Sequence, residues 1–397
     1  MRIFLLPLFI ALVVNCIIDY IIYKQLQRNT HAAFRTIRGA HVALSVVLGV
    51  SVILLAVTPK TLFAGHESTL SISIFAYGCL LAAKLVYVLV SQILRLVLPR
   101  KLRQCGIGIG IAAALVVISQ SAIATLATRY DIAVNHVTLY FPNLPDSFDG
   151  YRMAQFSDFH LNSFGNDTTF VHKAVTTIND LRPDVIFFTG DLASSTSSEV
   201  TCFVNTLSHL HAPDGVMSVL GNHDYSDYYP WTDMKAKAAD RAQLIKYERD
   251  AGWDVLLNES RVIRHGNDSI IIIGVQNIAR PPYHTYGNLG KSYNGLNDNN
   301  FKILLTHNPV HWRNEVLPKT NIDLTLSGHT HAMQMVISLF GKEFSPSAWL
   351  YKDWSGIYQQ SQQYLYVNIG LGSIGAPARF GDAAKPEITI ITLKKSK

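Results

Sequence analysis

Hydrophobic residues are unevenly distributed along the chain, and long apolar runs are confined to its first third. Four such runs lie at about 3 to 23, 41 to 58, 71 to 98 and 105 to 127. Each is near or above the ~20 residues that a helix needs to cross a bilayer. We therefore predict a transmembrane region with four helices over residues 1–130. A removable signal peptide is disfavoured because the first run continues through VVNCIIDYIIYK without a small-residue cleavage site, and the alternative for all four runs is a buried helical domain.

The charges around these runs predict an orientation. Residues 1–130 carry a net charge of +10, whereas the remainder carries −4. The basic residues gather in the first and third loops, at Lys24, Arg28, Arg35 and Arg38, and at Arg95, Arg100, Lys101 and Arg103. By the positive-inside rule these loops face the cytoplasm, so the region after Arg129 is predicted to be extracytoplasmic. Because the positive charge belongs to membrane loops, no nucleic-acid partner is expected.

Two charged residues, Asp19 and Lys84, lie within the apolar runs. Ionisable groups in membrane helices can mark a transport path. However, Asp19 lies near one end of its run, and Lys84 can pair or extend toward the interface. The pattern favours a membrane anchor, and a transporter is the alternative.

From residue 131 onward, short β-branched and aromatic runs alternate with helical stretches and polar turns, which predicts a layered α/β domain over residues 131–397. Only one of the four cysteines, Cys202, lies in this region, so no disulfide framework holds it together. Five of the predicted strands are followed directly by residues with carboxylate, amide or imidazole groups. YRMAQF precedes Asp158 and His160, DVIFFT precedes Asp191, GVMSVL precedes Asn222 and His223, FKILLT precedes His307, and IDLTLS precedes His329 and His331.

Each of these residues taken alone also has a structural explanation: an aspartate can cap a helix, Asn222 can occupy a turn, and His307 can be an ordinary buried imidazole. Together they form a set of oxygen and nitrogen ligands at the carboxyl ends of strands, where layered α/β folds place their ligand sites. A set without thiolates suits Mn, Fe, Zn or Mg better than a structural zinc site built from cysteines.

The order of the motifs SDFH, TGDL, LGNHD, LTHNP and SGHTH over residues 157–331 resembles that of the calcineurin-like metallophosphoesterases. Their pattern is D-x-H, G-D, G-N-H-D/E, a single H, and G-H-x-H. FDGYRMAQFSDFHLN and YVNIGLGSIGAPARFG are also similar to the membrane-anchored bacterial branch of that family, and the resemblance covers about residues 137–393. It implies a four-layer αββα sandwich preceded by the four-helix anchor.

The resemblance also implies a site with two divalent metal ions, of which Mn is favoured over Zn, Fe and Mg. The implied ligands of one ion are Asp158, His160, Asp191 and His331, and those of the other are Asp191, Asn222, His307 and His329. Asp191 then bridges two cations that together activate a hydroxide for attack on phosphorus. His223 is implied as the catalytic residue that contacts the phosphate and protonates the leaving oxygen.

Several residues depart from the family pattern. Ser194 stands where many relatives have the aspartate that orients the imidazole of the G-N-H motif, so His223 needs another partner, for which Asp224 is a candidate. Ala332 and Met333 replace two glycines. Ile369 replaces an arginine, which makes Arg379 and Arg280 candidates for substrate binding.

These features together predict a membrane-anchored hydrolase of a phosphodiester, phosphomonoester or pyrophosphate bond in an envelope or lipid-linked substrate. The cluster Tyr228, Tyr229, Pro230 and Trp231 either forms an apolar lip over the site or packs against a helix. One alternative is a UDP-2,3-diacylglucosamine pyrophosphatase of lipid A biosynthesis, whose cytosolic nucleotide sugar conflicts with the predicted topology. Another is a non-catalytic membrane receptor for a phosphorylated ligand, which is disfavoured because all seven metal-ligand positions are filled.

Overall fold

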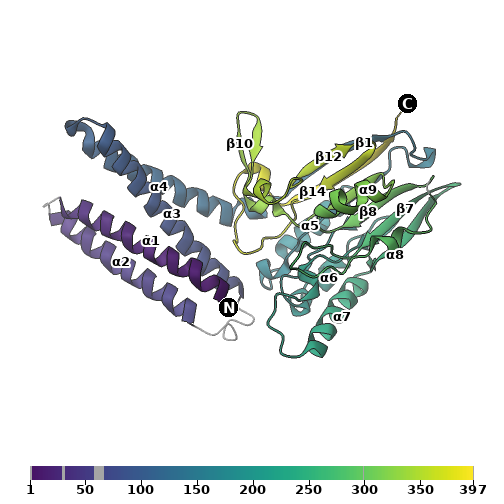
Figure 1. Ribbon diagram of the computed structural model, residues 1–397, viewed down its shortest axis with the longest axis horizontal. Helices are drawn as coiled ribbons and strands as arrows, with labels where there is room; N and C mark the ends of the chain where they lie inside the picture. Colours follow the sequence, from purple (N-terminus) through teal and green to yellow (C-terminus); the bar gives the residue numbers. More distant parts are fainter. Residues whose placement is uncertain (1, 29–31, 58–66, 298, 397) are drawn as a thin grey trace. The chain divides into compact units, whose positions relative to one another are not determined.

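The computed structural model describes residues 2–28, 32–57, 67–297 and 299–396, and it divides into two compact units (Figure 1). The first unit comprises Met1–Thr125 with Gly375–Pro377, and the second comprises Leu126–Ile374 with Ala378–Lys397. The main division therefore falls five residues before the predicted boundary at residue 130.

The N-terminal segment of the first unit is largely helical in its described residues. Its helices are α1 (Arg2–Gln27), α2 (Ala32–Val57), α3 (Glu67–Val97) and α4 (Arg103–Leu126). Three segments of the described chain are long and apolar enough to cross a membrane, namely Phe9–Gln27, Ser71–Val97 and Arg100–Tyr130. The predicted span at residues 41–58 lies largely within α2, and α2 is not one of these three segments. Residue 58, the last of that predicted span, lies outside the described residues. The structure thus supports three spans of the predicted four.

The two charged residues in the apolar runs lie side by side. Lys84 Nζ donates to Asp19 Oδ1 at 2.8 Å and to Asn15 Oδ1 at 3.2 Å. The Asn15 amide donates in turn to the other carboxylate oxygen of Asp19 at 2.8 Å. Pairing and hydrogen bonding reduce the cost of two charges among apolar helices, so this contact is compatible with a packed helical anchor.

Two six-stranded mixed sheets form the centre of the second unit. The first has the order β1 (Ala133–Phe141), β14 (Glu387–Lys395), β2 (Arg152–Phe156), β3 (Val185–Phe188), β4 (Val216–Ser218) and β5 (Asp254–Val255). The second has the order β12 (Gly356–Gln360), β13 (Gln363–Val367), β9 (Leu324–Ser327), β8 (Phe301–Thr306), β7 (Asp268–Val275) and β6 (Glu259–His265). A separate hairpin pairs β10 (Ile337–Leu339) with β11 (Lys342–Phe344).

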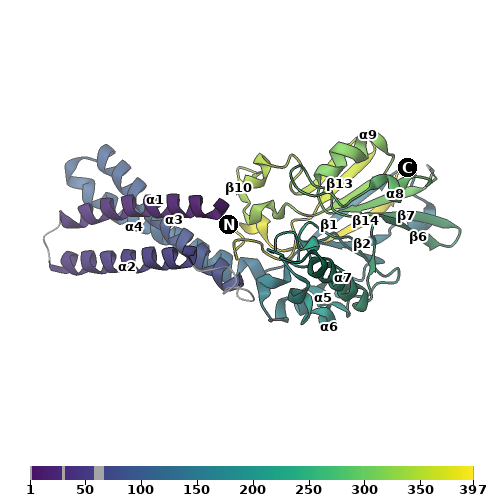
Figure 2. The ribbon, with the colours of Figure 1, turned by 60° about the horizontal axis from the view of Figure 1, so that its bottom comes forward.

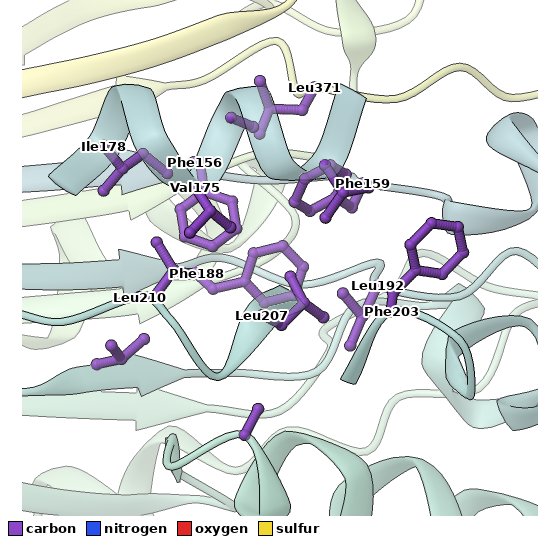
Figure 3. Close-up of a cluster of buried hydrophobic side chains, with 14 of the residues drawn as sticks. Phe156, Phe159, Val175, Ile178, Phe188, Leu192, Phe203, Leu207, Leu210 and Leu371 are labelled. Atoms are coloured by element: carbon purple, nitrogen blue, oxygen red, sulfur yellow. The ribbon is translucent and has the colours of Figure 1, made fainter. Parts of the chain in front are cut away.

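Apolar side chains from the facing sides of both sheets meet in one core, which includes Met153, Phe187, Ile272, Phe301 and Leu326. Helices cover both outer faces (Figure 2). The helices on the first sheet are α5 (Thr169–Asp180), α6 (Val204–Leu207) and α7 (Met234–Asp250), and those on the second are α8 (Leu289–Tyr293) and α9 (Leu317–Lys319). Figure 3 shows the core beneath α5, where Val175 and Ile178 lie near Phe156 and Phe188.

Strands β2, β3, β8 and β9 are almost entirely buried, since one face meets the opposite sheet and the other meets helices. Burial on both faces explains why these segments read as continuous apolar runs and not as an alternating pattern. Strands β2, β3 and β4 are parallel to one another, as are β7, β8 and β9. Parallel pairing carries the residues that follow these strands to a common edge of each sheet.

Candidate metal centre

Two groups of side chains that could each hold a metal ion lie in the loops after these strands. The first consists of Asp158, His160 and His331, all buried. His331 Nε2 lies 3.1 Å from His160 Nε2 and 3.2 Å from Asp158 Oδ1. Two ring nitrogens and a carboxylate oxygen therefore converge on one point.

The second group consists of Asp191, His307 and His329, and Asn222 joins it. His307 Nε2 lies 3.1 Å from His329 Nδ1, and the same distance from Asn222 Oδ1 and from Asp191 Oδ2. The other ring nitrogen of His307 is 2.8 Å from the carbonyl oxygen of Thr189. Nδ1 must donate to that carbonyl, so Nε2 is the ring nitrogen that faces the group.

One carboxylate oxygen faces both groups. Asp191 Oδ2 is 3.1 Å from His307 Nε2 in the second group and 3.6 Å from His160 Nε2 in the first. A shared carboxylate is the feature that a site for two adjacent divalent cations requires. The structure thus brings all seven predicted ligand residues together, in the two predicted sets.

Charge interactions within the site favour ionised carboxylates. Burial alone would raise the pKa of Asp158, but His331 and His307 hold it below its usual value. Burial, followed by the charge of His307, lowers the pKa of His329 to about 3, which leaves this imidazole neutral with a free lone pair. Asp191 and Asp158 outweigh burial and raise the pKa of His307 to about 9. A bound cation would take the place of the proton that His307 otherwise holds, so the donor set fits divalent metal ions.

The backbone reverses sharply at most of these residues. Asp158, His160, Asp191, His329 and His331 all have positive φ, between 44° and 74°. This left-handed conformation costs a non-glycine residue roughly 1–2 kcal/mol. It returns each side chain toward the end of the strand that precedes it.

The neighbouring glycines are required for close approach. A Cβ on Gly221 would overlap the Asp191 carboxylate, and a Cβ on Gly328 would overlap Ser157 and Asp158. The glycines of the G-N-H and G-H-x-H motifs thus allow the loops from both sheets to meet around the two groups.

His223 lies beside both groups and is fixed by the backbone. Its own N–H donates to Asp191 Oδ1 at 2.8 Å, and its ring Nδ1 donates to the carbonyl oxygen of Ser194 at 2.6 Å. Ser194, which stands in place of the family's aspartate, therefore orients His223 through its main-chain carbonyl group.

Asp224 is not the partner of His223. Its buried carboxylate accepts hydrogen bonds from the N–H groups of Asp191, Leu192, Ala193 and Gly221. Asp224 instead ties together the two loops that carry Asp191 and Asn222.

Two tyrosines contact the predicted ligands. The Tyr351 hydroxyl lies 2.9 Å from His329 Nε2, and the Tyr228 hydroxyl accepts a hydrogen bond from the Asn222 amide at 2.9 Å. The Tyr228 ring also stacks on His223, with centroids 4.3 Å apart. Tyr228 belongs to the aromatic cluster that the sequence places after the G-N-H-D motif, whereas no motif or spacing indicated Tyr351.

The two candidate substrate-binding arginines differ in accessibility. Arg379 is fully buried, and its guanidinium donates to the carbonyl oxygens of Ile369, Gly370, Gly372, Ala384 and Lys385. These contacts use its hydrogen-bond donors and leave none for a substrate, so the structure favours a structural role for Arg379 over the predicted substrate contact. Arg280 is exposed, and its guanidinium carbon lies 5.9 Å from the centroid of the Tyr351 ring.

The remaining departures from the family pattern have local explanations. Ala332 and Ile369 are buried in the same small apolar cluster, so these two departures pack together. Ala332 and Met333 have φ of 48° and 47°. The backbone thus keeps the left-handed shape that suits glycine, although neither residue is glycine.

Comparisons with known proteins agree with this geometry. Residues 151–333 match the family model described as calcineurin-like phosphoesterase. The chain is 32% identical over 261 residues to the uncharacterized metallophosphoesterase YkuE of Bacillus subtilis, which covers 64% of this chain and 82% of that protein. It is 28% identical over 270 residues to a Danio rerio transmembrane protein with metallophosphoesterase domain, covering 64% of this chain and 55% of that protein.

A third relative has a named activity. The UDP-2,3-diacylglucosamine pyrophosphatase LpxG of Chlamydia trachomatis is 27% identical over 321 residues, covering 67% of this chain and 93% of that protein. The order of the motifs, the two ligand groups and these similarities lead to one conclusion. The chain belongs to the calcineurin-like metallophosphoesterases, a family of metal-dependent hydrolases of phosphoester bonds.

Proposed function

We propose that this protein is a membrane-anchored phosphoesterase with two divalent metal ions that hydrolyses a lipid-linked or envelope phosphate substrate. The observation that carries the proposal is the single oxygen of Asp191 that faces both groups of ligands. In this proposal Asp158, His160 and His331 complete the first metal site. Asn222, His307 and His329 complete the second.

When bound, the two cations supply an activated water and stabilise negative charge on the attacking and leaving oxygens. The chain's own residues do the rest. The carbonyl oxygen of Ser194 holds His223 Nδ1, so the opposite ring nitrogen is the one available to a substrate. We assign His223 the transfer of a proton to the departing oxygen. The stacked ring of Tyr228 restricts His223 to one orientation.

Two observations support a lipid-linked substrate. Three described segments are able to span a membrane, and a relative aligned over most of its length is named for a pyrophosphatase of a diacylated nucleotide sugar. That activity is the second candidate for this chain. The bond cleaved is a phosphoanhydride in that case and a phosphoester in the first.

The charge pattern favours an extracytoplasmic catalytic unit. The connection between α3 and α4 is basic, with Arg95, Arg100, Lys101 and Arg103 at or near it. If this connection is cytoplasmic, then α4 leads outward. The basic first loop and this connection can both be cytoplasmic only if α2 also spans the bilayer. A reporter fused after Arg129 tests this orientation: activity of a reporter that functions only in the cytoplasm would reverse it.

The catalytic proposal is tested with the full chain in detergent micelles, loaded in turn with Mn, Zn, Fe or Mg. Substrates are a p-nitrophenyl monoester, a bis-p-nitrophenyl diester and a UDP-linked diacyl sugar. Asn222→Ala and His329→Ala should each abolish metal-dependent turnover, whereas His172→Ala on the exposed side of α5 should not. Unchanged turnover in both site variants would refute the assigned centre, and the preferred substrate decides between ester and anhydride.

A further inference from the structure

The hairpin β10–β11 and the turn that follows it expose an unusual number of apolar side chains. All six strand residues are exposed, and they include Ile337, Leu339 and Phe344. At the tip, Phe340 is 95% exposed, and Trp349 in the following turn is 86% exposed. In Figure 1 this hairpin stands out from the two sheets of the second unit. We define residues 337–344 with Trp349 and Leu350 as the apolar hairpin.

The geometry of the hairpin keeps these side chains outside the core. Ile337 pairs with Phe344 and Leu339 with Lys342, joined by the two residues Phe340 and Gly341. Both have positive φ, 52° and 72°, which is the pattern of a tight two-residue turn. A left-handed phenylalanine is disfavoured, and here it directs a large ring away from the protein. The surrounding chain therefore stabilises a conformation that exposes an aromatic side chain.

We propose that the apolar hairpin inserts into the interface of the bilayer in which the chain is anchored. Only Asp131 and Ile132 separate the last candidate span, which ends at Tyr130, from strand β1. A lipid surface is thus the partner to which the second unit is permanently tethered. Phenylalanine, tryptophan and leucine beside exposed lysines are the composition that interfacial segments use, because the rings enter the acyl boundary and the ammonium groups stay with the headgroups.

The charges of the hairpin stay on its exposed rim. Lys342 and Glu343 are neighbours in β11 and offset each other in charge, and Lys352 follows Trp349 by three residues; all three side chains are exposed. Met333, next to the hairpin in sequence, is also 42% exposed and has a left-handed backbone. A costly conformation that presents an apolar side chain to the outside is expected where that side chain has a role.

The position of the hairpin in the chain links it to the metal centre. It begins six residues after His331 and ends shortly before Tyr351, whose hydroxyl contacts His329. Insertion of this segment would hold the mouth of the site at the depth of lipid headgroups. The docking itself rests on the exposed side chains and the membrane anchor, and not on the reaction proposed above.

Tryptophan fluorescence tests the insertion without reference to activity. All five tryptophans lie in the second unit, so the membrane helices add no signal. The full chain is reconstituted into phosphatidylcholine–phosphatidylglycerol vesicles with or without brominated acyl chains, which quench only tryptophans that reach them. We expect brominated lipid to quench the Trp349 component, measured as the difference between the wild type and Trp349→Phe. In the Trp349→Phe background, a reporter at the tip, Phe340→Trp, should be quenched as well.

The matched control is Val262→Trp in the same background, because Val262 is 50% exposed on strand β6 of another hairpin of the second unit. Loss of emission at both hairpin positions but not at this control supports insertion. Absence of quenching at both hairpin positions overturns the proposal. A blue-shifted emission that brominated lipid leaves intact would then indicate a protein surface as the occupant. Equal quenching at all three positions also overturns it, since contact with lipid would then not be specific to the hairpin.

Discussion

Replacing Arg379 by lysine distinguishes a structural arginine from a substrate-binding one. The guanidinium is fully buried and donates to carbonyl oxygens of the loop that contains Gly370 and Gly372. The backbone of that loop in turn donates to Ser157 and Asp158 at the metal centre. Lysine has three donors where arginine has five, so at least two hydrogen bonds to a charged group are lost. At about 1.5–3 kcal/mol each, the free energy of unfolding should fall by roughly 3–6 kcal/mol.

The loss is measured by urea unfolding of the full chain in detergent micelles, followed by tryptophan fluorescence from the second unit. The KM for a bis-p-nitrophenyl diester is measured in parallel, at a temperature where the variant is folded. We expect lower stability and a KM close to that of the wild type. Arg280→Lys is the control, because this exposed side chain should leave stability unchanged. If Arg379→Lys retains its stability to within about 1 kcal/mol while KM rises about tenfold, the structural role is refuted.

Three further predictions concern other parts of the molecule. Ser194→Asp should restore a carboxylate near His223 and speed the hydrolysis of substrates with poor leaving groups, with little effect on activated p-nitrophenyl esters; equal effects on both would argue against proton donation by His223. Burial lowers the pKa of His311 to about 4 in the folded chain, despite the nearby Glu315. Because an unfolded histidine titrates at about pH 6.5, the neutral form favours the folded chain above that pH. This contribution of about 3 kcal/mol is lost as the pH falls toward about 4. Thermal unfolding of His311→Gln between pH 4.5 and about 7 should therefore depend less on pH than that of the wild type, and parallel curves would contradict the argument. Asp19→Asn and Lys84→Met should each destabilise the helical unit, and the double variant should lose less stability than the two single losses added together. If the two losses measured by unfolding in detergent are additive, the pair is not coupled.

The strands that lead to the metal centre were predictable from the sequence. Each of the five runs forms a strand, and each is followed by its predicted ligands, because a strand buried on both faces leaves a continuous apolar signature. The division of the predicted ligands into two groups was implied by the resemblance to the metallophosphoesterase family. Pairing across two sheets, by contrast, depends on contacts between segments far apart in the chain, and the periodicity of a single run contains no information about them.

Contacts that depend on how loops return to the site were not predictable. The hydroxyl of Tyr351 reaches His329 through a hairpin and a turn, and the partner of His223 is a carbonyl group that every residue possesses. Arg379 was predicted to bind substrate because of its charge. The carbonyl groups that occupy its donors come together only in the folded loop, so the sequence did not indicate them. The number of membrane spans also differs, since three segments qualify in the described chain and four were predicted.

The left-handed turns at the predicted ligands have a consequence for the order of assembly. Five of the seven predicted ligand residues hold a disfavoured backbone, and their loops come from strands of two separate sheets. Because these turns connect strands of both sheets, we expect the sheets to pair before the predicted ligands converge. Cations would then bind a chain that is already folded, in contrast to small zinc domains that fold around their ion. In that case the metals available where the second unit completes folding would decide which ions it holds.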